Sequence, residues 1–183
     1  FAEQVVMPSG AADRAEMVRI LADLARRSPD WEVLIKPRIA PEEETFHSVD
    51  DHISTTVKQT LGHAPKNLRL DYRPLPELLR QARLMATVSS TAFFDALDFG
   101  CRPLVMSDFG INPANGSHVF AGSGVWREID AVEDLDALDQ ELPQPDPEWL
   151  AWMGYGTKLE PDRLIGALRE PRASPPDRPS TNA

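Results

Sequence analysis

The chain has 183 residues, of which 42% are hydrophobic and 26% are charged. This composition is typical of a globular domain and excludes a disordered chain. Lys and Arg number 19 against 29 Asp and Glu, so the net charge is −10, which disfavours nucleic acid and allows at most peripheral contact with an anionic membrane. The single cysteine, Cys101, excludes an internal disulfide and a cysteine-rich metal site, and it favours a reducing, cytoplasmic compartment.

Short apolar runs bounded by turn residues predict strands, and apolar side chains repeating every three or four residues predict helices between them. In chain order, the predicted elements are strand 4–7, helix 17–24, strand 31–35, helix 53–61, strand 68–72, helix 74–82, strand 84–88, a helix from Ser89 to a stop at Gly100, strand 102–106, a long loop 108–124, and helices 148–152 and 163–168. The alternation predicts an α/β fold, with a doubly wound, Rossmann-like parallel sheet between two layers of helices.

Residues 1–170 are predicted to form this one domain. Residues 171–183 contain four prolines and no large apolar side chain, which predicts a disordered tail. The sequence begins with Phe1 and runs directly into an apolar segment, so we interpret it as part of a longer protein that also has an amino-terminal domain.

Ligands of open parallel sheets bind outside the carboxyl ends of the strands, and two predicted strands end in small or cationic residues. Ser9 and Gly10 precede the first helix, where free N–H groups could meet an anion, although such turns are more often structural. Lys36 and Arg38 directly follow the second strand and could hold a phosphate or carboxylate. The alternative for this pair is an ion pair with the acidic residues 42–44.

The strongest candidate is the run Ser89, Ser90 and Thr91, which follows the fourth strand and opens a helix. One hydroxyl suffices to cap a helix, so the other hydroxyls and the first N–H groups suit a phosphate. Asp95, one turn later, could reach a ribose hydroxyl or simply be solvated. The Gly- and Asn-rich loop 108–124 is a further candidate, because long loops are often functional.

Other familiar sites are not indicated. The sequence has no Gly-x-Ser-x-Gly elbow, no Walker motif and no Gly-x-Gly-x-x-Gly opening the first helix. The four histidines lack metal-ligand spacing, so we expect surface or capping roles for them and no metal site. Cys101 lies at a turn without an evident histidine partner, which favours an inert thiol.

The order of these segments resembles the carboxyl-terminal, nucleotide-binding half of GT-B glycosyltransferases, especially bacterial sialyltransferases, Kdo transferases and capsule-polysaccharide enzymes. The resemblance rests on Lys36-Pro37-Arg38, the run 89–91, Asp95 and the Gly100-Cys101-Arg102-Pro103 turn, and it covers residues 4–130. Those enzymes carry His where this chain has Arg38, which weakens the case for a CMP-linked donor.

The resemblance implies a donor-binding domain in cell-surface polysaccharide synthesis. Its substrates would be a nucleotide sugar, CMP- or UDP-linked, and a glycan acceptor, with no other cofactor. The catalytic base of such enzymes comes from the amino-terminal domain, so this chain alone is expected to bind rather than to turn over. Two alternatives stay open, a nucleotide-sugar epimerase and a non-enzymatic anion-binding or interaction module, because fold does not fix function.

Overall fold

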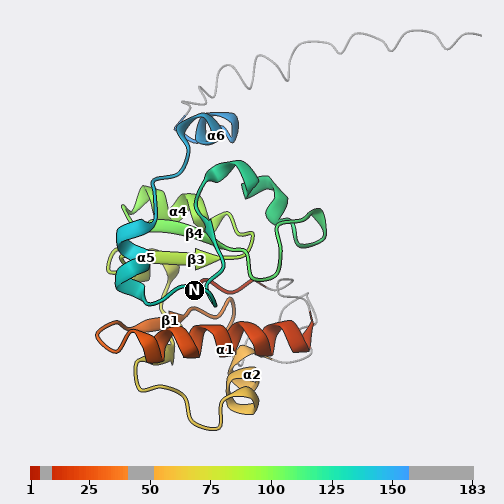
Figure 1. Ribbon diagram of the computed structural model, residues 1–183, viewed down its shortest axis with the longest axis vertical. Coiled ribbons are helices and arrows are strands. Elements are labelled where there is room, and N and C mark those ends of the chain that lie inside the picture. Colours follow the sequence, from red (N-terminus) through yellow and green to blue (C-terminus); the bar gives the residue numbers. More distant parts are fainter. Residues whose placement is uncertain (5–9, 41–51, 157–183) are drawn as a thin grey trace, which may run out of the picture.

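The computed structural model describes residues 1–4, 10–40 and 52–156 (Figure 1). Its strands and helices alternate along the chain as predicted. In order they are α1 (Ala11–Arg27), β1 (Val33–Ile35), α2 (Ile53–Thr60), β2 (Leu68–Leu70), α3 (Leu75–Leu79), β3 (Leu84–Thr87), α4 (Ala92–Asp98), β4 (Arg102–Met106), the 3₁₀ helices η1 (Pro113–Asn115) and η2 (Ser117–Ser123), β5 (Trp126–Arg127), α5 (Leu135–Glu141) and α6 (Pro147–Trp152).

All the strand pairs among the described residues are parallel. β1 pairs with β2, and β3, β4 and β5 form a second group in that order. The amino-terminal segment 1–4 joins the two groups: Ala2 forms a parallel bridge with Lys36, and the Ala2 N–H donates to the Ala86 carbonyl at 2.9 Å. The strand order is therefore β2, β1, segment 1–4, β3, β4, β5, which is the Rossmann order.

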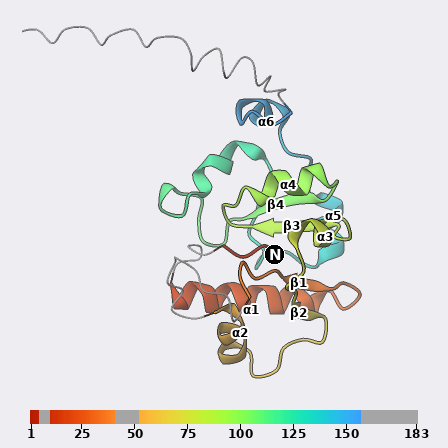
Figure 2. The ribbon, with the colours of Figure 1, turned by 180° about the vertical axis from the view of Figure 1, so that it is seen from behind.

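Helices cover both faces of this layer, which confirms the doubly wound α/β prediction. α1 packs on α2, and the Leu135 N–H at the start of α5 donates to Ser28 Oγ just after α1, so these three helices share one face. α3 and α4 contact each other on the opposite face. Both views place α1 and α2 on one side of β3 and β4, and α4 on the other (Figures 1 and 2).

The packing of α4 explains how the carboxyl-terminal part of the described chain is held. Phe93 is fully buried and meets Phe120 of η2 and Trp149 of α6, with ring centroids 5.2 and 5.5 Å apart. The Trp149 indole N–H donates to the Val119 carbonyl at 2.9 Å. Burying several large aromatic rings together is a major source of stability, so α4, η2 and α6 are fixed as one unit.

Several predicted boundaries need correction. The first strand already pairs at residues 1–3, where Phe1 and Glu3 make backbone bonds to Leu34 and Lys36, and residues 5–7 of the predicted strand 4–7 lie outside the described residues. The predicted loop 108–124 contains the two 3₁₀ helices, and the strand β5 and helix α5 were not predicted. The helix predicted at 163–168, the tail 171–183 and Ser9 lie outside the described residues.

Candidate functional site

The carboxyl ends of the parallel strands meet at one edge of the sheet. After segment 1–4 the chain passes to α1 on one face, and after β3 it passes to α4 on the other. In open α/β sheets, ligands bind at the carboxyl edge between two neighbouring strands whose following connections run to opposite faces of the sheet. Gln4 ends the first of these strands and Ser89 follows the second, so we place the candidate site between them.

The Gln4 side chain ties the two strand ends together. Its Oε1 accepts from the Ser89 backbone N–H at 2.8 Å and from the Thr87 hydroxyl at 3.2 Å, while its Nε2 donates to Ser89 Oγ at 3.1 Å. The Ser89 N–H can only donate, so it fixes which end of the amide is the oxygen. Sequence reasoning missed Gln4, since nothing in its local pattern distinguishes it from an ordinary strand residue.

This network leaves the Ser89 hydroxyl hydrogen, at the carboxyl edge of the sheet, without an acceptor in the described part of the chain. A serine hydroxyl has one hydrogen to donate and can also accept. Because Ser89 Oγ accepts from Gln4, its own hydrogen is free to point at another acceptor. Ser89 is half-buried, so that acceptor can be a ligand oxygen entering from the edge.

The other hydroxyls of the run have different roles. Ser90 Oγ accepts from the Ala92 N–H at 3.2 Å and caps α4, as one member of the run was expected to do. Thr91 is exposed and makes no capping bond through its side chain. Asp95 is exposed on the first turn of α4, near the same edge.

The segment after β4 approaches Ser89 closely. Gly116 has a φ of +71°, which favours glycine, and a Cβ atom there would lie 3.5 Å from Ser89 Oγ. Asn115 holds this segment rigid by donating to the Phe109 and Gly110 carbonyls and accepting from the Ser117 N–H. The loop predicted as a functional candidate therefore reaches Ser89.

Ser107 directly follows β4 at the same edge and carries a polar group without a partner among the described residues. It is 8% exposed, and among the described residues its hydroxyl has no hydrogen-bond partner. Buried hydroxyls are normally hydrogen-bonded to protein, water or ligand. This orphan hydroxyl is a second polar atom at the carboxyl edge that needs an external partner.

The predicted anion-binding residues Gly10, Lys36 and Arg38 lie near the same edge, in different environments. Gly10 precedes α1 in an extended conformation without a side-chain cap, so the first turn presents N–H groups. Lys36 follows β1 and its Nζ donates to the neighbouring Pro37 carbonyl. Arg38 is exposed, and its backbone N–H donates to Glu3 Oε2 at 3.2 Å. Lys36 and Ser89 share the carboxyl edge, as predicted, with segment 1–4 between their strands.

A buried ion pair lies beside these cations. Arg14 of α1 donates to Glu3 Oε1 at 2.6 Å, and their side chains are 9% and 7% exposed. The pair fastens the first turn of α1 to segment 1–4. Neither Arg14 nor Glu3 was predicted as a site residue. Glu3 directly precedes Gln4 in the chain.

The carboxylates of Asp71 and Asp108 at this edge have structural partners. Asp71 after β2 is held by Arg73 and Arg69, and the hydrogen bonds from Arg73 keep the pKa of Asp71 well below its usual range. Asp108 accepts from the Ile129 and Asp130 N–H groups. In the described part of the chain, no group of three or more His, Cys, Asp or Glu side chains is arranged to hold a metal ion.

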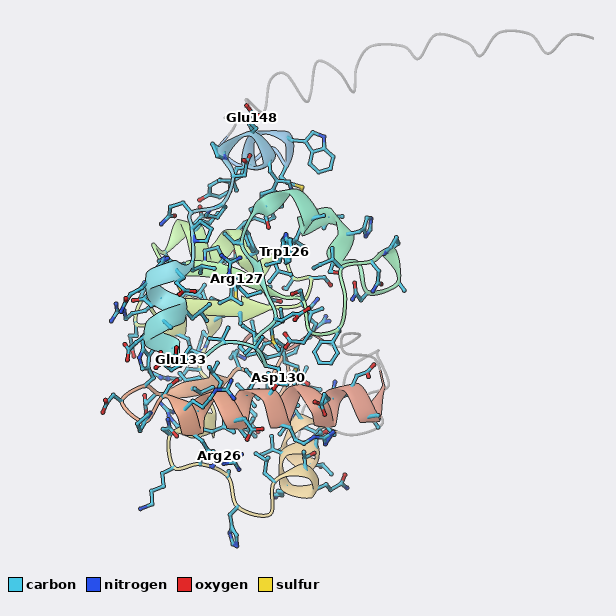
Figure 3. The ribbon with its side chains drawn as sticks, viewed as in Figure 1. Arg26, Trp126, Arg127, Asp130, Glu133 and Glu148 are labelled. Atoms are coloured by element: carbon cyan, nitrogen blue, oxygen red, sulfur yellow. The ribbon has the colours of Figure 1, made fainter. Side chains whose placement is uncertain are left out.

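Figure 3 labels residues of β5 and of the segment that follows it. Trp126 and Arg127 lie on β5, and Asp130 and Glu133 lie in the segment that leads from β5 to α5. Arg27 at the end of α1 donates to the Glu133 carbonyl at 3.0 Å. This segment is therefore anchored at both ends, by Asp108 and by Arg27.

Two further predictions can be compared with the structure. His52 caps α2 by accepting from the Ser54 N–H at 3.1 Å, so its predicted capping role is confirmed. Cys101 is buried, and burial raises the pKa of its thiol to about 11, so its inertness stays a prediction that this environment supports. His47 lies outside the described residues.

In the described segments, every helix is too short or too polar to cross a bilayer. A family model described as "Putative glycosyltransferase (DUF6716)" matches residues 1–170. Neither a curated protein nor a solved structure is significantly similar to the chain.

Proposed function

Because the chain belongs to this family of putative glycosyltransferases, we propose that it is the donor-binding domain of a glycosyltransferase and that the phosphate of a nucleotide sugar binds at the crevice between segment 1–4 and β3. One observation carries the proposal: Gln4 holds Ser89 at the switch point of the sheet with the Ser89 hydroxyl hydrogen free to donate. The family membership supports the reaction class, and the position of Ser89 at the carboxyl edge of the sheet supports the proposed place.

The chemistry required of this site is stabilisation of a leaving group. The anomeric carbon of the sugar forms a bond to an acceptor hydroxyl oxygen while its bond to the donor phosphate oxygen breaks, and the acceptor proton passes to a base. Negative charge grows on the departing phosphate, so donors aimed at it lower the barrier. Ser89 and Thr91, the first N–H groups of α1 after Gly10, and the cations Lys36 and Arg38 are proposed to supply them.

The resemblance to GT-B enzymes of cell-surface polysaccharide synthesis extends the proposal. On that basis the donor is CMP- or UDP-linked, the acceptor is a glycan, and the catalytic base belongs to a partner domain. Asp95 is proposed to meet the ribose, since it lies one turn along α4 from Thr91.

The test is the thermal stability of the chain with and without CMP, CDP and UDP at millimolar concentration. A ligand that binds only the folded state stabilises it by RT ln(1 + [L]/Kd), so a nucleotide that binds should raise the Tm. Ser89→Ala and Lys36→Ala should each reduce that rise, because a lost charge-assisted hydrogen bond weakens binding by roughly 1.5–3 kcal/mol.

Lys66→Ala is the matched control. Lys66 is an exposed lysine that precedes β2, at the opposite edge of the sheet, so its loss should leave the nucleotide-dependent rise intact. If none of the nucleotides raises the parent Tm, or if the Ser89 and Lys36 variants respond as the parent does, the proposed site is wrong.

A further inference from the structure

Ser89 and Ser107 occupy corresponding positions after two neighbouring strands. β3 and β4 pair in parallel with Thr87 opposite Val105, so extending this register by two residues sets Ser89 opposite Ser107. Neighbouring strands of a sheet lie about 4.8 Å apart. The two serines at the carboxyl edge are therefore separated by about one strand spacing.

The backbone of β4 turns the Ser107 side chain toward the face that α4 covers. The N–H groups of Val105 and Ser107 both donate to carbonyls of the segment 125–127, at 3.1 and 2.9 Å, so the alternation of β4 continues through Ser107. Thr87, the register partner of Val105, accepts from the Ser90 N–H at 3.3 Å just before α4. Thr87, Val105 and Ser107 therefore share the α4 face.

Gln4 keeps the Ser89 side chain on the same face, although the chain has left β3 at this point. The Gln4 amide accepts from the Thr87 hydroxyl and donates to the Ser89 hydroxyl, so these two hydroxyls lie on one side of the sheet. The hydroxyls of Ser89 and Ser107 consequently stand on one face of the carboxyl edge, carried by adjacent strands.

The Ser107 hydroxyl is unsatisfied in the free chain. Ser107 is 8% exposed, and its Oγ has no hydrogen-bond partner among the described residues, Ser89 included. Its backbone is fixed on both sides, because the N–H donates to Arg127 and the carbonyl accepts from the Gly110 N–H at 2.8 Å. A buried hydroxyl without a partner lowers stability, and such a group in a native protein calls for a ligand, ion or water.

One segment, residues 110–116, borders both serines. Gly110 at its start bonds to the Ser107 carbonyl, and a Cβ atom on Gly116 at its end would lie 3.5 Å from Ser89 Oγ. Both glycines have positive φ, 76° and 71°, which glycine adopts at little cost. At these two positions the segment therefore meets the serines with backbone atoms alone.

The hydrogens of the two hydroxyls specify which kind of atom can join them. Ser89 Oγ accepts from Gln4, so its own hydrogen is available, and the Ser107 hydrogen is also unused. Two donors about 4.8 Å apart can each lie about 2.7 Å from one oxygen placed between them. A phosphoryl oxygen accepts two such bonds without donating any, and its negative charge strengthens both.

We propose that Ser107 is a further residue that binds the sugar donor, and that it shares one phosphoryl oxygen of the nucleotide with Ser89. The inference rests on the proposed function and extends its site from β3 to β4, on the side away from Lys36. The Ser107 oxygen has almost no exposed surface in the free chain, so binding includes a small displacement of residues 110–116. The ligand then supplies the partner that the hydroxyl lacks.

The experiment compares Ser107→Ala with Ser28→Ala in thermal melts over a range of CMP, CDP and UDP concentrations, which give the ligand-free Tm and the Kd of each variant. Ser28 is the matched control, a buried serine after α1 whose hydroxyl accepts from the Leu135 N–H. Ser107→Ala should melt no lower than the parent and bind nucleotide at least about tenfold more weakly, because it loses a bond only in the complex. Ser28→Ala should melt at least about 2 °C lower and keep the parent's Kd.

The outcomes separate this inference from the proposed function. If Ser107→Ala binds nucleotide as tightly as the parent while Ser89→Ala binds more weakly, the role of Ser107 is refuted and the proposed function stands. If no nucleotide raises the Tm of the parent, both are wrong. A ligand-free Tm of Ser107→Ala as low as that of Ser28→Ala would also overturn the inference, since the hydroxyl would then have a partner, such as a bound water, in the free chain. Cytidine and uridine lack the phosphate, so a loss of their binding in Ser107→Ala equal to the loss for the nucleotides would exclude the phosphoryl oxygen as the partner.

Discussion

Replacing Gln4 tests the arrangement at the switch point most directly. In Gln4→Leu the side chain keeps its approximate size but loses the amide that serves Thr87 and Ser89. Thr87 is fully buried, so its hydroxyl cannot turn to water for a new acceptor. The Ser89 N–H loses its acceptor in the same step.

The expected cost follows from these two donors. A buried donor left without a partner costs about 1–3 kcal/mol, and Ser89 is only half-buried. We therefore expect Gln4→Leu to lower the free energy of unfolding by about 2–4 kcal/mol. Gln4→Glu keeps an acceptor for both donors, so its cost should be smaller, about 1 kcal/mol for the single lost bond to Ser89 Oγ.

Urea denaturation at neutral pH measures both changes, with Gln81→Leu as the control on an exposed glutamine. The control should stay within about 0.5 kcal/mol of the parent, as surface substitutions do. The Glu variant adds a second readout, because its negative charge should repel the donor phosphate and reduce the nucleotide-dependent Tm rise. If Gln4→Leu unfolds at the parent's urea concentration, the network does not hold the strand ends together.

Three further predictions concern single groups. Glu3→Gln should cost about 3 kcal/mol in urea denaturation, because it removes the buried countercharge of Arg14, and a loss below 1 kcal/mol would contradict this. Ser90→Ala should cost about 1 kcal/mol by loss of the α4 cap, measured in the same way. Cys101, with its pKa raised to about 11 by burial, should react with a thiol reagent at pH 8 far more slowly in the folded chain than in urea.

Most of the fold could be predicted because its signals are local. β4 was predicted with its observed bounds, Arg102–Met106, from a continuous apolar run between a glycine stop and a polar loop. Gly100 has a φ of +71° and ends α4 as expected of a left-handed glycine after a helix. Each such signal lies within a few residues of the element it specifies.

The missed elements had weaker or misread local signals. β5 has two residues, too few for any periodicity, and it is defined by pairing with β4. α5 did carry a signal: Asp134 accepts from the Ala137 N–H as its cap, and Leu135, Leu138 and Leu142 follow at helical spacing. The dense acidic residues around them are typical of a solvated surface, and they obscure the apolar stripe.

The candidate site was harder to predict because its contacts join distant parts of the chain. The hydroxyl run could be recognised from the sequence alone. Which hydroxyl caps the helix and which stays available is decided by residues outside the run. Ser90 Oγ accepts from the N–H of Ala92, two residues away, and so caps α4. Ser89 Oγ instead accepts from Gln4, which lies 85 residues earlier in the chain. No local pattern contains that second partner, and Gln4 alone resembles any polar residue at a strand end.

The partner nevertheless decides what Ser89 can do. If Gln4 accepted from the Ser89 hydroxyl, that hydrogen would be spent inside the protein and the run would be a structural cap and nothing more. Because the Ser89 N–H takes the Gln4 oxygen, the Gln4 nitrogen must donate to the hydroxyl, and the hydroxyl hydrogen stays available. A strand order that places Gln4 beside Ser89 thus converts an ordinary serine into an outward-pointing donor at the edge where doubly wound sheets hold their ligands.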